Sequence, residues 1–250
     1  MKWKTIKQRF FKYWILPWGA CYFMVLPLYA DDNVISLEQS GDNLQLGIDQ
    51  VGHSNEIRML DSNSYITATS LDMYLVQYNS HQTALPNKII FDEVSGIGNQ
   101  MKICQGCAWN TLDSDTDLTW YYDDYEGGGH EVNLTLYGDY NQVAVQQTNQ
   151  TNATDGHDFD LHLAGDSNEV KIKQQSSGAK DIDLTIYNDY NDVFVRQKGA
   201  NATHNATITL DGLYGTDLIL KQLGTTTQAY SISIDCMTVG GCSATVQQGN

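Results

Sequence analysis

Three seven-residue stretches decide the fold of this chain: NQVAVQQ at residues 141–147, NEVKIKQ at 168–174 and NDVFVRQ at 191–197. Each reads Asn-x-Val-x-apolar-x-Gln, so that polar and apolar residues alternate with a period of two. That period places the apolar side chains on one face of a β-strand. A fourth stretch, TDLILKQ at 216–222, keeps the apolar positions and the Gln but lacks the Asn.

A second alternating run precedes each of these stretches: VNLTL at 132–136, FDLHL at 159–163, IDLTI at 182–186 and ATITL at 206–210. Gly-Asp or Asn-Asp turns join the first three pairs of runs, and such residues permit a sharp backbone reversal. The sequence therefore predicts repeated strand–turn–strand units, here called rungs. One rung cannot bury both of its apolar faces, whereas a stack of rungs can.

The Asn and Gln residues share the parity of the valines, so we expect them at the two ends of the buried strip. Identical amides stacked in register hydrogen-bond as ladders. The closing glutamines lie 23 to 28 residues apart, with one interval of 42, and their seven intervals imply eight rungs. The predicted ladder residues are Gln50, Gln77, Gln105, Asn141, Gln147, Asn168, Gln174, Asn191, Gln197, Gln222 and Gln248.

The fold class that follows is all-β: a β-solenoid of about eight strand–turn–strand rungs, with two facing parallel sheets. Residues 31–250 form this repeat domain. In the first rung we expect a turn at Gly41-Asp42-Asn43, and in the second a long polar connection from Asp61 to Ser70. The last predicted strand ends at Gln248, so we expect an open rung there, which is a template for further strand pairing.

Residues 1–30 read as a secretory signal peptide. Lys2, Lys4, Lys7, Arg9 and Lys12 precede a largely apolar segment and a Leu28-Tyr29-Ala30 cleavage site. The alternative is a retained membrane anchor, which the short apolar run, interrupted by prolines and a glycine, disfavours. Cleavage would leave nine basic and 30 acidic residues, a formal net charge of −21. Such a chain lacks the basic patch that nucleic-acid binding requires.

The long interval holds an acidic insertion at about residues 113–130. Asp113, Asp115 and Asp117 have the spacing of an EF-hand calcium loop, but Leu118 stands where that loop requires Gly. We therefore expect a solvated acidic loop and no metal or other cofactor, with these three aspartates as the weak metal candidates.

The cysteines after residue 30 number four, which in an exported chain suggests two disulfides. Cys236 and Cys242 flank the predicted turn of the last rung, and we expect a disulfide across it. Cys104 and Cys107 could form a redox pair, but a local structural disulfide is favoured because the pair lacks the strand-then-helix setting of a thioredoxin-like site.

No pattern of catalytic residues stands out, and we expect no enzyme. The chain has no Gly-x-Ser-x-Gly, Walker or Rossmann signature. Its six histidines look scattered, and we expect His157 and His162 at the surface. The outward positions of the second strands vary from rung to rung, so no outward column of constant residues is expected.

Residues 50–57, QVGHSNEI, carry the phrase Gln-x-Gly-x-x-Asn-x-apolar, and residues 105–112, QGCAWNTL, match it with Cys107 in the Gly position. This phrase resembles the repeat of curlins, the subunits of bacterial curli amyloid fibres. The resemblance implies secretion by an outer-membrane apparatus and an extracellular, cell-surface location. It also implies assembly with itself or with sister subunits into fibres that act in biofilm matrix and adhesion.

Rung length, the insertion and the cysteines depart from the compact major curlin repeat, which favours a minor, nucleating or capping subunit. The alternative function is a monomeric calcium-binding or adhesive β-solenoid on the cell surface, using the acidic insertion.

Overall fold

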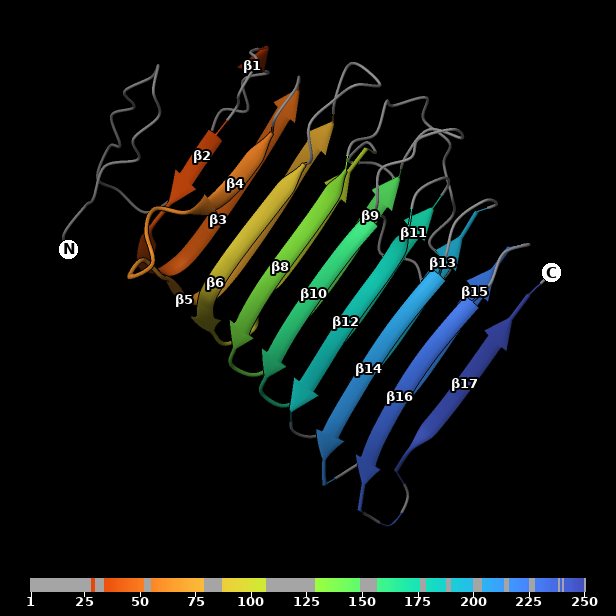
Figure 1. Ribbon diagram of the computed structural model, residues 1–250. Coiled ribbons are helices and arrows are strands. Elements are labelled where there is room, and N and C mark those ends of the chain that lie inside the picture. The colour runs from red at the N-terminus through yellow and green to blue at the C-terminus, as the bar shows by residue number, and fades with distance from the viewer. Residues whose placement is uncertain are drawn as a thin grey trace.

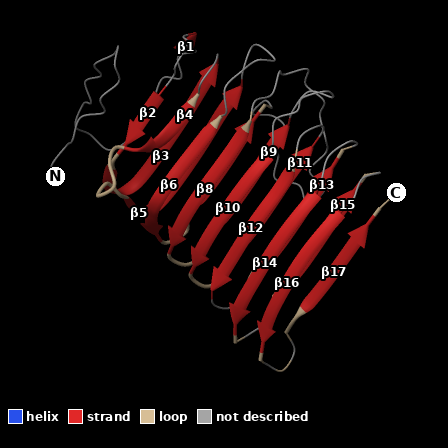
Figure 2. Ribbon diagram, in the orientation of Figure 1, coloured by secondary structure: helices blue, strands red, loops and turns tan. Residues whose placement is uncertain are grey.

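The computed structural model describes residues 28–29, 34–51, 55–78, 87–106, 129–148, 157–175, 179–187, 190–199, 204–213, 216–224, 228–237, 239 and 241–249. Within these ranges the chain is all-β and contains no helix, as Figure 2 shows. None of these residues therefore belongs to a helix of the length and apolarity needed to cross a membrane. The predicted fold class is confirmed.

Two layers of parallel strands face each other, and each rung contributes one strand to each layer (Figure 1). The even-numbered layer contains β2 (Val34–Leu37), β4 (Glu56–Met59), β6 (Lys88–Gly96), β8 (His130–Tyr137), β10 (His157–Ala164), β12 (Lys180–Tyr187), β14 (His204–Gly212) and β16 (Gln228–Cys236). The odd-numbered layer contains β1 (Leu28–Tyr29), β3 (Gln39–Val51), β5 (Ile66–Tyr78), β7 (Gln100–Gln105), β9 (Gln142–Thr148), β11 (Glu169–Gln175), β13 (Asp192–Lys198), β15 (Asp217–Leu223) and β17 (Ser243–Gln248).

Eight successive strand pairs, from β2–β3 to β16–β17, make the rungs of a β-solenoid. Each strand pairs in parallel with the strand two places further along the chain, so that equivalent residues of neighbouring rungs stack. One such column in the odd-numbered layer is Ile48, Leu75, Ile103, Val145, Ile172, Val195, Leu220 and Val246.

The core lies between the two layers and consists of these stacked apolar columns. Strands β8, β10 and β12 alternate strictly between buried and more exposed residues, as the period of two predicts. Phe159, Ile182 and Leu184 are fully buried at the centre of the stack. Burial of such side chains is the main favourable contribution to folding, and each contributes roughly 1.5–3 kcal/mol.

The first two rungs differ from the prediction. No turn interrupts residues 41–43, because β3 runs unbroken from Gln39 to Val51. The connection expected from Asp61 to Ser70 ends earlier, since β5 begins at Ile66. The start of β5 pairs with the end of β6 and buries Ile66 and Ala68, so it belongs to the even-numbered layer before the strand crosses the corner. A strand that bends around the corner has no turn signature in its sequence.

The corners of the later rungs use the predicted turn residues. Gly138 and Gly165 have φ values of 118° and 147°, and Tyr140, Ser167 and Tyr190 adopt the left-handed conformation at φ of 57–59°. The turns stack as the strands do: the Tyr140 amide donates to the Asp166 carbonyl of the next rung at 2.8 Å. At Gly138 and Gly165 the backbones approach so closely that a side chain has no room.

Candidate functional site: two amide ladders and an open rung

An uninterrupted row of glutamine side chains runs along one edge of the core. Each Nε2 donates to the Oε1 of the glutamine one rung earlier, at distances of 2.7–3.2 Å. The row contains Gln50, Gln77, Gln105, Gln147, Gln174, Gln197, Gln222 and Gln248, and the first seven are fully buried. Glutamine occupies these positions because the carboxamide can donate and accept along the stack, which no apolar residue can do.

The same nitrogen also ties the two layers together. Nε2 of Gln147 donates to the Asp158 carbonyl at 2.9 Å, and Nε2 of Gln174 donates to the Asp181 carbonyl at 2.9 Å. Equivalent bonds lead from Gln50, Gln77, Gln105, Gln197 and Gln222 to the carbonyls of Glu56, Lys88, Glu131, Asn205 and Ala229. Each of these glutamines therefore fixes the spacing between rungs and holds the first strand of the following rung against its own.

A second row, of asparagines, lies at the opposite end of the strip, beside the corner turns. Nδ2 of Asn141 donates to Oδ1 of Asn168 at 2.9 Å, and Asn168 bonds Asn191 in the same way. Asn99, which was not among the expected ladder residues, extends the row by donating to Asn141 at 2.8 Å. Asn141 and Asn168 also donate to the carbonyls of Gly138 and Gly165, so these side chains close the turns.

A buried polar column, unexpected from the sequence, lies at the start of the even-numbered strands. His130, His157, Lys180 and His204 stack in consecutive rungs and are at most 2% exposed. The expectation of scattered surface histidines is therefore wrong for His157, while His162 contacts Tyr187 with ring centroids 5.1 Å apart. The histidines escaped notice because each rung contributes only one and the residue type changes along the column.

Burial makes the charged forms of this column unfavourable. It lowers the pKa of His130 to about 3 and that of Lys180 to about 8. For His157, burial together with the nearby His130 and Lys180 holds the pKa well below its ordinary value. Burial and, secondarily, Lys180 lower the pKa of His204 to about 4. The three imidazoles are neutral at pH 7.

The outer face of the even-numbered layer carries an acidic groove. Its lining includes Glu131, Asp158, Asp160, Asp181 and Asp183. Asp158 lies opposite Asp181 and Asp160 opposite Asp183 in adjacent strands, so like charges stack. The outward positions of these first strands also vary from rung to rung, but aspartates repeat in the two adjacent strands β10 and β12. Burial raises the pKa of Asp158 and Asp160, and the opposing aspartates raise it further.

Replacing Asp160 by Asn, the residue that Asn133 already supplies one rung earlier, is expected to stabilise the fold by about 0.5 kcal/mol at low salt, because one like-charge pair is removed. Urea denaturation at low and high salt measures the effect, which salt should reduce. Asp42→Asn on the exposed part of β3 is the matched control. Equal stability of Asp160→Asn and wild type at low salt contradicts the prediction.

The last described rung, β16–β17, is paired on one side only. β16 and β17 each pair with one neighbouring strand among the described residues, β14 and β15. Tyr230 is 47% exposed and Val246 36% exposed, although they continue columns that are buried in the earlier rungs. The unpaired strand edges and the exposed apolar side chains form a surface of the kind to which another strand pair adds.

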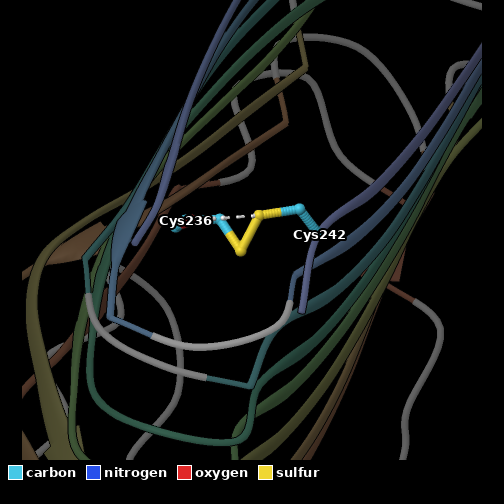
Figure 3. The surroundings of a disulfide bond; sticks show 2 residues. All are labelled: Cys236 and Cys242. Carbon is cyan, nitrogen blue, oxygen red and sulfur yellow. Dashed lines mark hydrogen bonds between the residues drawn. A yellow bond between two sulfur atoms is a disulfide. The ribbon is translucent and has the colours of Figure 1, made fainter. Parts of the chain in front are cut away.

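A disulfide joins Cys236 and Cys242 at the corner of this rung, as predicted (Figure 3). It lies where the earlier rungs have stacked Gly-Asp turns, and it covalently links the end of β16 to the residue before β17. Cys104 at the end of β7 is also disulfide-bonded. Cys107 lies outside the described residues.

The weak metal candidates Asp113, Asp115 and Asp117 also lie outside the described residues, as does almost all of the acidic insertion. His130, expected at its end, is instead the first residue of β8. The part of the chain that the structure describes contains no group of three or more His, Cys, Asp or Glu side chains suited to a metal ion.

The geometry defines a class of protein: a parallel β-solenoid whose rungs are held by internal amide ladders and whose last described rung is paired on one side only. Comparison of the chain with protein-family models, curated proteins and solved structures gave no match.

Proposed function

We propose that the chain is a secreted structural subunit of curli-like extracellular amyloid fibres. It acts in biofilm matrix and surface adhesion, as a minor or nucleating subunit, and its partners are further copies of itself or sister subunits delivered by an outer-membrane secretion apparatus. The resemblance of residues 50–57 and 105–112 to the curlin repeat supports this family assignment. The proposal makes the chain a structural protein and not an enzyme.

The observation that carries the proposal is the unpaired edge of the last described rung, β16–β17. Its inward residues continue the internal columns: Val246 follows Leu220, and Gln248 follows Gln222 with an amide bond of 3.2 Å. At the other end of the stack these columns reach Ile48 and Gln50 of β3, and β1 pairs with β3 beside Gln50. β1 lies within the predicted signal peptide, so cleavage of that peptide would free this edge of the first rung. The last rung of one copy therefore has the residues to pair with the first rung of another, by the contacts that join rungs within the chain.

Val246→Asp tests this assembly, because a carboxylate placed in the apolar column of the new interface would be buried without a partner. We expect the variant to remain folded and to lose the ability to seed fibres, measured by dye binding and cross-β diffraction. Thr245→Asp, on the outward side of the same strand, is the matched control and should seed normally. Deletion of residues 230–250 should also abolish seeding; seeding at wild-type rates by Val246→Asp or by the deletion refutes the proposal.

The alternative, a monomeric calcium-binding or adhesive surface solenoid, is distinguished by calorimetric titration of the purified chain with Ca²⁺. Tight binding without fibre formation would favour it. Fibre formation independent of Ca²⁺ would favour the proposed function.

A further inference from the structure

The buried polar column forms a continuous seam beside the glutamine row. His130, His157, Lys180 and His204 are paired in register from β8 to β14, and Gln228 follows in β16. Asn55 and Asn87, both fully buried, precede the first strands of rungs two and three in the same place, and their carbonyls accept the amides of Lys88 and Glu131. Amide residues therefore occupy the seam at both ends, and ionisable residues occupy it in rungs four to seven.

The surroundings of the three histidines favour the neutral imidazole. The rings of His130 and His157 lie 5.0 Å apart, and Lys180 lies between His157 and His204. Glycines face two of the rings from the odd-numbered layer. A Cβ added at Gly106 would lie 3.2 Å from Nε2 of His130, and one added at Gly224 would lie 3.0 Å from Cε1 of His204. Nδ1 of His157 lies 3.3 Å from the carbonyl oxygen of Ala179. Burial, His130 and Lys180 lower the pKa of His157 by more than this contact raises it.

The described carboxylates that adjoin the column in sequence face away from it. Glu131, Asp158 and Asp181 follow its members directly in sequence and hence point to the opposite face of the same strands, where they line the acidic groove. Nε2 of His157 and both ring nitrogens of His204 lack a hydrogen-bond partner among the described residues. A proton added to one of these rings would place a positive charge in the core beside Lys180 or a second histidine.

We propose that this column is an acid-sensitive seam: the closed solenoid holds its three histidines neutral, and acidification opens the edge of the stack at the rungs that carry them. The inference concerns the folded chain itself and does not depend on fibre assembly.

The direction of the effect follows from proton linkage. An unfolded histidine has a pKa of about 6.5, so below that pH the unfolded state binds more protons than the folded state and stability falls. The lowered pKa of Lys180 changes the stability only at higher pH, between about 8 and 10.4. The raised pKa values of Asp49, Asp158, Asp160 and Asp192 act in the opposite sense. The contribution of the histidines is therefore measured as the difference between the wild type and variants that lack them, in which these aspartates are unchanged.

Replacing all three histidines by Asn copies the residues that the chain itself places in the seam at Asn55 and Asn87. We expect urea denaturation of the full chain to show that unfolding of the wild type takes up more protons than unfolding of the triple variant. The difference should rise from less than about one proton at pH 7 to nearly three at about pH 5.5. His162→Asn, on the half-exposed outer face of β10, is the matched control and should keep the wild-type pH dependence.

If the triple variant does not fold, a single substitution provides the same test. His204→Gln copies Gln228, its neighbour in the column, and should reduce proton uptake on unfolding by nearly one at about pH 5.5. Equal pH dependence of the wild type and of whichever of these variants folds would overturn the inference. Because denaturation is measured on monomeric protein, failure here and failure of the fibre proposal are separate results.

Discussion

Gln174→Met is expected to lower the free energy of unfolding by about 3 kcal/mol. Methionine keeps the volume of the side chain but cannot donate to Oε1 of Gln147 or to the carbonyl of Asp181, both now 2.9 Å from Nε2. These two oxygens then lose their side-chain donor inside the protein, and each lost hydrogen bond costs about 1–3 kcal/mol of stability. Nε2 of Gln197 loses its acceptor in residue 174 but keeps the carbonyls of Lys180 and Asn205.

Urea denaturation measures this loss, and Gln142→Met is its matched control. Gln142 lies on the exposed side of β9, where its Oε1 accepts one exposed bond from Gln100 at 3.1 Å. Its replacement should change stability by less than about 0.5 kcal/mol. Similar effects of the two substitutions would mean that the glutamine row is only a consequence of stacking and contributes little to stability.

Gly138→Ala is expected to destabilise the solenoid by about 3 kcal/mol or more. A Cβ at this position would lie 1.6 Å from the Gly96 carbonyl oxygen of the preceding rung, and the residue has φ of 118°, a conformation that alanine disfavours. The obstacle is backbone on a neighbouring strand, so a side-chain rotation cannot relieve it. Thermal denaturation should show a large fall in Tm.

Gly41→Ala provides the comparison for this substitution. A Cβ at Gly41 meets no heavy atom within 4 Å, and the residue is not in the positive-φ region. Alanine there should leave stability unchanged or raise it by up to about 1 kcal/mol, because it restricts the unfolded chain. If Gly138→Ala behaved like Gly41→Ala, the close stacking of the corners would be contradicted.

The period of two and the repeated Asn and Gln positions were sufficient to predict the solenoid and the strand pairs of the later rungs from the sequence. The reason is physical: a residue with the parity of the core and an amide side chain can be buried only if it is hydrogen-bonded, and an in-register stack supplies its partners. Gln50, Gln77 and Gln105 could be assigned although their rungs are degenerate, because the closing Gln recurs at a regular interval.

Features that depend on side-by-side contacts between rungs were harder to predict. His130, His157 and His204 belong to one column only once the register is known, and the intervals between them are unequal. The acidic groove was missed for the same reason, since its aspartates alternate with the apolar residues of separate strands. At β3 and β5 the bend around the corner occurs within a continuous strand, so neither a Gly-Asp pair nor a break in pairing marks it.

The two amide rows point in opposite directions along the stack. In the glutamine row each N–H is directed toward the preceding rung, whereas in the asparagine row it is directed toward the following one. Each row is a chain of aligned dipoles whose members polarise one another, yet the two dipole sums oppose each other over the rungs that contain both. Where both rows run, the solenoid can therefore lengthen without accumulating a large axial side-chain dipole, while every added layer strengthens the hydrogen bonds already formed.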